Sequence, residues 1–148
     1  MPLAPVPWDS SDLTSLLDVL QAATWPSSPE GAAAAWQTFY ASRTARLWVL
    51  REGDETRGLI GLRATGPGAA EITHIAVRPI WRGQGIGRSM VHELITREGL
   101  QELSAETDGE AAPFYRRLGF AVRSLGERYP GVERFSCTLR TPLPHTEP

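Results

Sequence analysis

The segment from Arg82 to Gly87 constrains the fold of this 148-residue chain most strongly, because its three glycines separate a predicted strand from a predicted helix. The segment reads Arg82-Gly83-Gln84-Gly85-Ile86-Gly87 and is followed by Arg88. Glycines let the backbone approach a bound group, and the first turn of a helix offers free N–H groups and the positive end of the helix dipole. We therefore predict an anion site for phosphate groups here, with Arg82 and Arg88 at its rim.

Two common phosphate-binding motifs do not fit this segment. A dinucleotide-binding fingerprint would need its third glycine at the position of Arg88, and it would need an acidic residue at the end of a following strand. A P-loop needs a lysine after its last glycine, whereas all fifteen Lys-or-Arg positions of this chain hold arginine. A tight turn that binds no ligand stays open as the purely structural alternative.

Composition narrows the class of protein. An apolar content of 41% and a charged content of 22% are ordinary for a globular domain. No apolar run approaches the roughly 20 residues that span a bilayer, and the proline-rich segment 1–8 lacks the basic start of a signal peptide. A net charge of -2 does not attract nucleic acid. We therefore expect neither a membrane nor a nucleic-acid partner.

The chain contains one cysteine, Cys137. A single cysteine excludes a disulfide framework and a cysteine-based zinc site within one chain, so no metal is predicted. A reducing, cytoplasmic location fits this usage. In the predicted last strand Cys137 lies on an apolar face, so we expect a buried thiol there and not a nucleophile.

Two helices are predicted before the first hairpin. Asp9, Ser10 and Ser11 are positioned to cap a helix that runs to about residue 23 and carries leucines on one face. A second helix is predicted over residues 29–42, because it starts with Pro-Glu and is rich in alanine.

The rest of the chain alternates between strands and helices. Strands are predicted at residues 47–50, 58–63, 71–77, 103–107, 120–125 and 132–139, and helices from residue 86 to Gly99 and over 111–118. The order is β-α-α-β-β-β-α-β-α-β-β, and the crossover around the glycine segment requires a parallel strand pair. We expect one α/β domain over residues 1–140, with a mixed six- to seven-stranded sheet and helices on both faces, followed by a disordered tail at 141–148.

Two motifs resemble those of the GCN5-related N-acetyltransferase (GNAT) family, and together they cover about residues 71–125. The acyl-CoA-binding motif of that family resembles Val77-Arg78-Pro79 followed by Arg82-x-x-Gly85-x-Gly87. A second signature resembles Thr107-Asp108-x-x-Ala111-x-x-Phe114-Tyr115-Arg116-Arg117-Leu118-Gly119-Phe120. The resemblance implies an N-acetyltransferase that moves an acetyl group from acetyl-CoA to a primary amine. It also implies a mostly antiparallel sheet that splays between its fourth and fifth strands around the pantetheine arm.

The resemblance implies cofactor contacts for two stretches of backbone. The first pairs with the pantetheine arm and polarises the thioester carbonyl through an N–H near its end; it comprises Ile75, Ala76 and Val77. The second binds the pyrophosphate and comprises Arg82, Gly83, Gln84, Gly85, Ile86, Gly87 and Arg88. Many relatives carry asparagine at the position of Asp108, which is expected to cap the following short helix, with a cofactor contact as the alternative.

The resemblance also implies catalytic candidates. Tyr115 falls at the family's usual general-acid position, although a phenol pKa near ~10 lies above the ~8.5 of a thiol; a packed core tyrosine is the alternative. Glu71 lies where related enzymes often place a glutamate that acts as a base through water. His74 has an ordinary pKa near ~6.5, but strand alternation places it on the face opposite Glu71. Glu71, His74 and water therefore stay open as the base.

The acceptor amine is not specified by these motifs. We expect a small-molecule amine, with a protein or peptide amine and a non-catalytic acyl-CoA-binding module as alternatives. Aromatic residues of the second helix and the last hairpin either border the acceptor cleft or only pack; they are Trp36, Phe39, Tyr40 and Tyr129. Dimers are common in the family, so a homodimer stays open.

Overall fold

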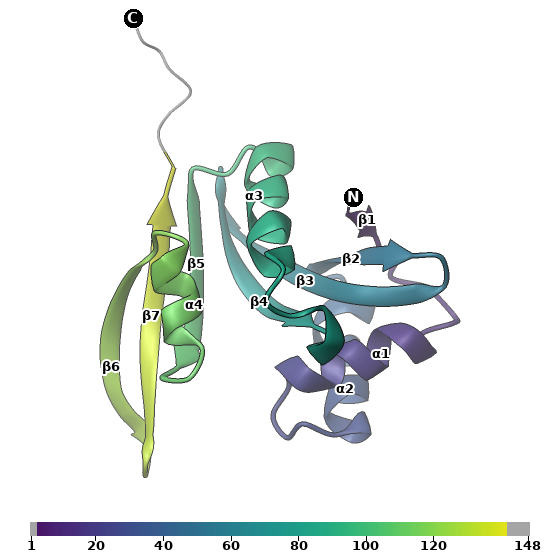
Figure 1. Cartoon of the computed structure of the whole chain (residues 1–148), viewed down its shortest axis with the longest axis horizontal. Helices are drawn as coiled ribbons and strands as arrows, with labels where there is room; N and C mark the ends of the chain where they lie inside the picture. Colours follow the sequence, from purple (N-terminus) through teal and green to yellow (C-terminus); the bar gives the residue numbers. More distant parts are fainter. Residues whose placement is uncertain (1–2, 142–148) are drawn as a thin grey trace, which may run out of the picture. The chain divides into compact units, whose positions relative to one another are not determined.

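A computed structural model describes residues 3–141 of the chain (Figure 1). Within this range the elements are β1 (Ala4–Pro5), α1 (Thr14–Leu20), α2 (Pro29–Ala35), β2 (Arg46–Glu52), β3 (Glu55–Gly66), β4 (Ala69–Val77), α3 (Ile86–Glu98), β5 (Glu102–Asp108), α4 (Ala112–Arg117), β6 (Ala121–Tyr129) and β7 (Val132–Arg140). This is the predicted order. The seven strands form one mixed sheet in the order β1-β2-β3-β4-β5-β7-β6. β4 pairs parallel with β5, as the crossover through α3 requires.

The described chain divides into two compact units. The first contains the residues up to Arg63 together with Thr73–Leu94. The second contains Ala64–Ile72 and the residues from Ile95 onward. The boundaries fall inside β3, β4 and α3, so each of these elements contributes to both units.

The first unit carries helices on both faces of its strands. One face of β2 contributes Leu47 and Val49 to a core with α1, α2 and β3, and its helical members include Leu16, Val19, Leu20, Ala32 and Trp36. α3 packs on the opposite face, where Ile86 and Met90 lie against Gly58 of β3. This confirms the predicted placement of helices on both sides of a mixed sheet.

The second unit is built on an antiparallel hairpin. β7 pairs with β6 on one side and with β5 on the other. Cys137 of β7 lies opposite Ala105 of β5 and is fully buried, as predicted for an inert thiol. Tyr115 and Phe120 complete this core from α4 and the turn that follows it.

Three sequence predictions about the elements need correction. Helix α1 begins at Thr14, after Leu13, which has no side chain that can cap it, so Asp9, Ser10 and Ser11 do not provide the predicted cap. The predicted second helix continues beyond α2 as a π-helical segment, Trp36–Ala41, which no residue preference foretells. β6 continues past residue 125 to Tyr129, because Gly126 at φ 80° absorbs a bulge in the hairpin.

The described residues end at Thr141, the first residue of the predicted tail. Thr141 donates hydrogen bonds from its N–H to the Gln101 carbonyl and from its hydroxyl to the Leu100 carbonyl, at 2.9 and 2.8 Å. The remainder of the tail predicted at 141–148 lies outside the described residues. None of the helices within residues 3–141 has the length and apolar character needed to cross a bilayer.

Candidate active site

The glycine loop adopts the strand-to-helix geometry that the sequence predicts. β4 ends at Val77, a short 3-10 turn covers Pro79–Trp81, and α3 begins at Ile86. Gly83 and Gly85 both have φ near 79°, in the left-handed region that favours glycine. The N–H of Ser89 donates to the Gly85 carbonyl at 2.9 Å, so the N–H groups of the preceding turn have no carbonyl partner within the helix.

The space around the two glycines is open. A β-carbon built at Gly83 or at Gly85 would meet no other atom of the described chain within 4 Å. The left-handed backbone conformation therefore favours glycine at these positions, whereas packing against other protein atoms does not require it. This arrangement fits a phosphate group that approaches the exposed loop, where the Arg82 and Arg88 side chains are also exposed.

Arg82 connects the loop to the strand before it. Its Nε donates to the carbonyl of Val77 at 2.9 Å. A second arginine stabilises the turn from the β2–β3 hairpin, because the Arg57 guanidinium stacks on the Trp81 ring at 3.7 Å from its centroid. The loop is thus held on both sides by arginine side chains.

Arg78 is a structural residue that sequence reasoning missed. Its Nε donates to the Thr56 carbonyl at 2.6 Å, and its terminal nitrogens reach the Asp18 carboxylate at 2.6 Å and the Ser15 carbonyl at 3.3 Å. One side chain therefore ties the start of the glycine loop to α1 and β3. Arg78 is part of the sequence motif, but its partners Thr56 and Asp18 lie 22 and 60 residues away in the chain, so no local sequence pattern predicts these contacts.

The part of β4 that precedes the loop carries a polar cluster. The Tyr40 hydroxyl lies 2.7 Å from Thr73 Oγ1 and 2.6 Å from His74 Nδ1. Strict alternation would direct Thr73 and His74 to opposite faces, yet both side chains reach the same oxygen. Thr73 and His74 therefore depart from the strict alternation predicted for this strand.

Burial determines the protonation of this cluster. It raises the pKa of Tyr40 above its ordinary value and lowers the pKa of His74 to about 4. His74 is therefore neutral at physiological pH. Tyr40 and Trp36 are buried in the core of the first unit, so packing accounts for both aromatic rings, while Phe39 is half-buried and stands edge-on to the His74 ring.

Tyr115 lies in the second unit on the buried side of α4. Its ring packs edge-on against Phe114 and Phe120, with centroids 5.1 and 5.2 Å apart. Burial, with a smaller electrostatic contribution from Cys137, raises the pKa of Tyr115 above its ordinary value. The hydroxyl therefore keeps its proton at neutral pH. Burial likewise raises the pKa of the Cys137 thiol, against a smaller opposing effect of Arg116.

Two acidic candidates also belong to the second unit. Glu71 of β4 is half-buried and pairs in register with Ser104 of β5. Asp108 accepts hydrogen bonds through Oδ1 from the N–H groups of Glu110 and Ala111, at 3.1 and 3.0 Å, just before α4. Asp108 therefore stabilises the turn that leads into α4, whereas α4 itself begins after Ala111 without a side-chain cap, so the predicted helix cap at Asp108 needs correction. Tyr129, in the last hairpin, is 65% exposed.

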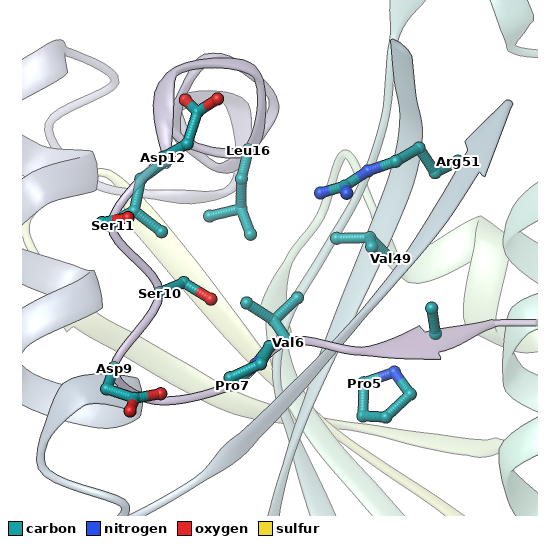
Figure 2. Close-up of a pocket in the computed structure, with 12 residues that line it drawn as sticks. Pro5, Val6, Pro7, Asp9, Ser10, Ser11, Asp12, Leu16, Val49 and Arg51 are labelled. Carbon is teal, nitrogen blue, oxygen red and sulfur yellow. The ribbon is translucent and has the colours of Figure 1, made fainter. Parts of the chain in front are cut away.

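A cavity of about 400 Å³ lies elsewhere in the first unit. Figure 2 shows its walls, with Val6 and Pro7 after β1, Asp12 and Leu16 at α1, and Arg51 reaching in from β2. It contains none of the residues predicted to bind a cofactor or to act in catalysis. The cavity is therefore separate from the candidate active site.

Comparison with known proteins identifies the family. Residues 43–122 match the acetyltransferase (GNAT) domain, and this stretch is more than half of the chain. The chain belongs to the GNAT family. This confirms the resemblance read from the glycine loop and from the motif around Tyr115.

Two GNAT relatives show the range of similar sequences. The chain is 34% identical over 130 residues to histone acetyltransferase TAP1 of Glycine max, which covers 80% of this chain and 54% of that protein. It is 39% identical over 75 residues to the N-alpha-acetyltransferase RimI of Mycobacterium tuberculosis, which covers 49% of this chain and 48% of that protein. The chain therefore spans about half the length of these relatives.

Solved GNAT structures share the fold. An aminoglycoside 6'-N-acetyltransferase complexed with coenzyme A aligns at a TM-score of 0.75 and 17% identity, covering 98% of this chain and 100% of that one. A GNAT acetyltransferase from Elizabethkingia anophelis with acetyl-CoA bound aligns at 0.68 and 18% identity, covering 95% and 97%. At these identities the likeness establishes the fold alone.

Proposed function

We propose that this GNAT chain transfers the acetyl group of acetyl-CoA to a primary amine by direct attack. The observation that carries the proposal is the exposed glycine loop, in which Gly83 and Gly85 both adopt φ near 79° before the start of α3. Such a loop suits the pyrophosphate of coenzyme A. The coenzyme A and acetyl-CoA bound to the two solved GNAT structures support the same cosubstrate.

Acetyl-CoA would supply the activated acetyl group as its thioester. The loop backbone and the side chains of Arg82 and Arg88 would hold the pyrophosphate. The backbone of β4 from Ile75 to Val77 would pair with the pantetheine arm. An N–H group near Val77 would donate to the thioester carbonyl, where negative charge develops during attack.

Tyr115 would act as the general acid. Because burial raises its pKa, its hydroxyl holds a proton that it can donate to the sulfur of the leaving thiolate. The same shift makes complete proton transfer less favourable. Donation of a hydrogen bond to the sulfur would then provide much of the stabilisation.

Glu71 would accept the proton of the amine through water. A carboxylate is a weak base for an ammonium group, so a water chain would have to assist. Water without Glu71 is the competing hypothesis. Both predict a rate that rises with pH as the free amine forms.

A small-molecule amine is the first acceptor class we propose, and a protein or peptide amine is the second. The second is favoured by one observation, since the two sequence relatives are named as a histone acetyltransferase and an N-alpha-acetyltransferase. The aminoglycoside enzyme shares only the fold with this chain. A cytoplasmic location and a homodimer stay predictions.

The test is release of coenzyme A thiol from acetyl-CoA with panels of small amines and of peptides, for the wild type and for Tyr115→Phe. We expect turnover with at least one panel and a loss of about 10²-fold in the variant, as for removal of a general acid. Binding of acetyl-CoA without turnover on either panel would favour a non-catalytic acyl-CoA-binding module. Failure to bind acetyl-CoA would refute the assignment of the glycine loop.

A further inference from the structure

The Tyr40 hydroxyl links the segment after α2 to two consecutive residues of β4. It contacts Thr73 Oγ1 at 2.7 Å and His74 Nδ1 at 2.6 Å. Tyr40 is 2% exposed, and the edge of the Phe39 ring closes one side of the imidazole at a centroid distance of 5.1 Å. Polar contacts of this length in a buried place each require one proton between the two heavy atoms.

With a neutral imidazole, two arrangements of protons satisfy both contacts and also give the buried phenol proton an acceptor. In the first, Tyr40 donates to His74 Nδ1 and accepts from the Thr73 hydroxyl, so the imidazole carries its proton on Nε2. In the second, Tyr40 donates to Thr73, and His74 donates from Nδ1 to the phenol oxygen. The second arrangement leaves Nε2 as an unprotonated base.

Donor and acceptor strengths favour the first arrangement. A phenol is a stronger hydrogen-bond donor than the alcohol of Thr73, and a neutral imidazole nitrogen is a stronger acceptor than a hydroxyl oxygen. The first arrangement pairs the strongest donor with the strongest acceptor. Burial keeps both groups neutral, since it raises the pKa of Tyr40 and lowers that of His74.

We propose that Tyr40 is a positioning residue that holds His74 as the neutral Nε2–H tautomer, so that His74 donates a hydrogen bond to the substrate and is not the general base. The functional half of this proposal rests on the proposed acetyl transfer. Among the described residues, Nδ1 is the ring nitrogen that has a hydrogen-bond partner, which leaves the Nε2–H group for a substrate atom or water.

The position and charge of His74 indicate what it would bind. It directly precedes Ile75, the first residue of the β4 segment proposed to pair with the pantetheine arm. A neutral N–H group binds a carbonyl, hydroxyl or carboxylate oxygen and does not attract an ammonium group. Amine substrates that carry such an oxygen close to the reacting amine are therefore favoured as acetyl acceptors.

The tautomer is measured directly by long-range ¹H–¹⁵N correlation spectra of the full chain labelled with ¹⁵N-histidine, with His74→Gln used to assign the signals. At pH 7 we expect an unprotonated Nδ1 and a protonated Nε2. A protonated Nδ1, a charged ring or a rapid mixture of tautomers would overturn the proposal. This readout requires no enzymatic activity, so it stays valid if the proposed acetyl transfer fails.

Two variants test the role of Tyr40. Tyr40→Phe removes the donor to Nδ1, so the population of the Nδ1–H tautomer should rise; an unchanged spectrum of a folded variant would contradict the positioning role. Thr73→Val removes the other partner of the hydroxyl and should leave the tautomer of His74 unchanged. A switch in tautomer on Thr73→Val would instead support the second proton arrangement.

Kinetic measurements then distinguish whether His74 acts as a hydrogen-bond donor or as a general base. Once an acceptor is found, His74→Gln should be about tenfold more active than His74→Leu, because glutamine restores one hydrogen-bond donor. Equal losses in both variants, with loss of a titrating limb from the pH–rate profile, would identify His74 as a base. Absence of turnover in the wild type would bear on the proposed function alone, since the tautomer is read independently.

Discussion

The hydroxyl of Tyr40 lies directly over Gly61 of β3, in space that a β-carbon at that position would need. The Thr73 hydroxyl occupies part of the same space. Gly61 lies within a regular strand and is not among the glycines with positive φ. Glycine at this position is therefore explained by the close approach of a buried tyrosine, not by a turn.

Substitution of Gly61 by alanine should destabilise the fold. The added methyl group would have to displace both the Tyr40 hydroxyl and the Thr73 side chain, and overpacking of this kind typically costs about 1–3 kcal/mol. Urea unfolding measures the change. Gly66→Ala, at the open end of the same strand, is the matched control and should change stability far less, because no atom lies near its added methyl group.

The Tyr40–Gly61 contact can be measured as a coupling energy. Tyr40→Phe removes the hydroxyl, which is the nearest of the three atoms that crowd a β-carbon at position 61; the other two are Thr73 Oγ1 and the Tyr40 ring carbon Cζ. The double variant should therefore be less destabilised than the sum of the single variants, by about 0.5–3 kcal/mol, as is typical of residues in direct contact. Additive effects would show that the hydroxyl does not occupy this space in solution.

The loop glycine Gly85 should have a second role beyond stability. Gly85→Ala forces alanine into the left-handed region, which costs about 1–2 kcal/mol. It should also weaken acetyl-CoA binding by about tenfold or more, the equivalent of one lost charge-assisted hydrogen bond. Titration calorimetry with acetyl-CoA and thermal unfolding measure the two effects.

Gly53 provides the control for this prediction. It has φ 60° in the turn between β2 and β3, and a β-carbon there also meets nothing within 4 Å. Gly53→Ala should therefore lower stability by a similar amount and leave the affinity for acetyl-CoA unchanged. If both variants weakened binding equally, the loss would come from general destabilisation, and the glycine loop would not be the phosphate site.

Arg78 should stabilise the fold through backbone carbonyls more than through its ion pair. Arg78→Ala removes a charged donor from the carbonyl of Thr56, a fully buried residue, and we expect a loss of about 1–3 kcal/mol in the free energy of unfolding. The Asp18 carboxylate is 64% exposed, so Asp18→Ala should change stability by less than about 1 kcal/mol. Urea denaturation of both variants decides between these contributions; equal losses would mean that the ion pair dominates.

Stability should fall below neutral pH because of His74. An unfolded histidine has a pKa near ~6.5, and burial lowers the pKa of His74 to about 4. At pH values between these two pKa values, His74 binds a proton in the unfolded chain but not in the folded chain. The contribution of His74 to the free energy of unfolding is therefore fully present above about pH 6.5 and is lost as the pH falls toward about 4. The loss should reach about 3 kcal/mol over this range.

The pH effect is measured as the difference in unfolding free energy between wild type and His74→Gln at several pH values. The wild type should lose more stability on acidification than the variant. His92→Gln, at an exposed position of α3, is the control and should follow the wild-type profile. Parallel curves of unfolding free energy against pH for the wild type and His74→Gln would mean that His74 takes up its proton in the folded chain over the same pH range as in the unfolded chain.

The sequence by itself determined the features that neighbouring residues encode. The turn before α3 was predicted because its glycines let the backbone approach a bound group without a β-carbon in the way, and the structure adds that Gly83 and Gly85 have positive φ. The helix stops at Gly99 and Gly119 were predicted for similar local reasons, and both are observed. The crossover through α3 favoured a parallel strand pair, because a connection of this length can return the chain to the end of the sheet where the first strand began.

Only the tertiary structure decided which distant residues meet. Tyr40 reaches His74 across 34 positions, and Arg78 reaches Asp18 across 60, so neither contact leaves a periodic or local pattern in the sequence. Strand alternation separated His74 from Thr73, whereas the backbone of β4 brings both to one hydroxyl. The direction of a side chain in a strand follows from the register and irregularities that non-local packing imposes, and residue type alone does not specify them.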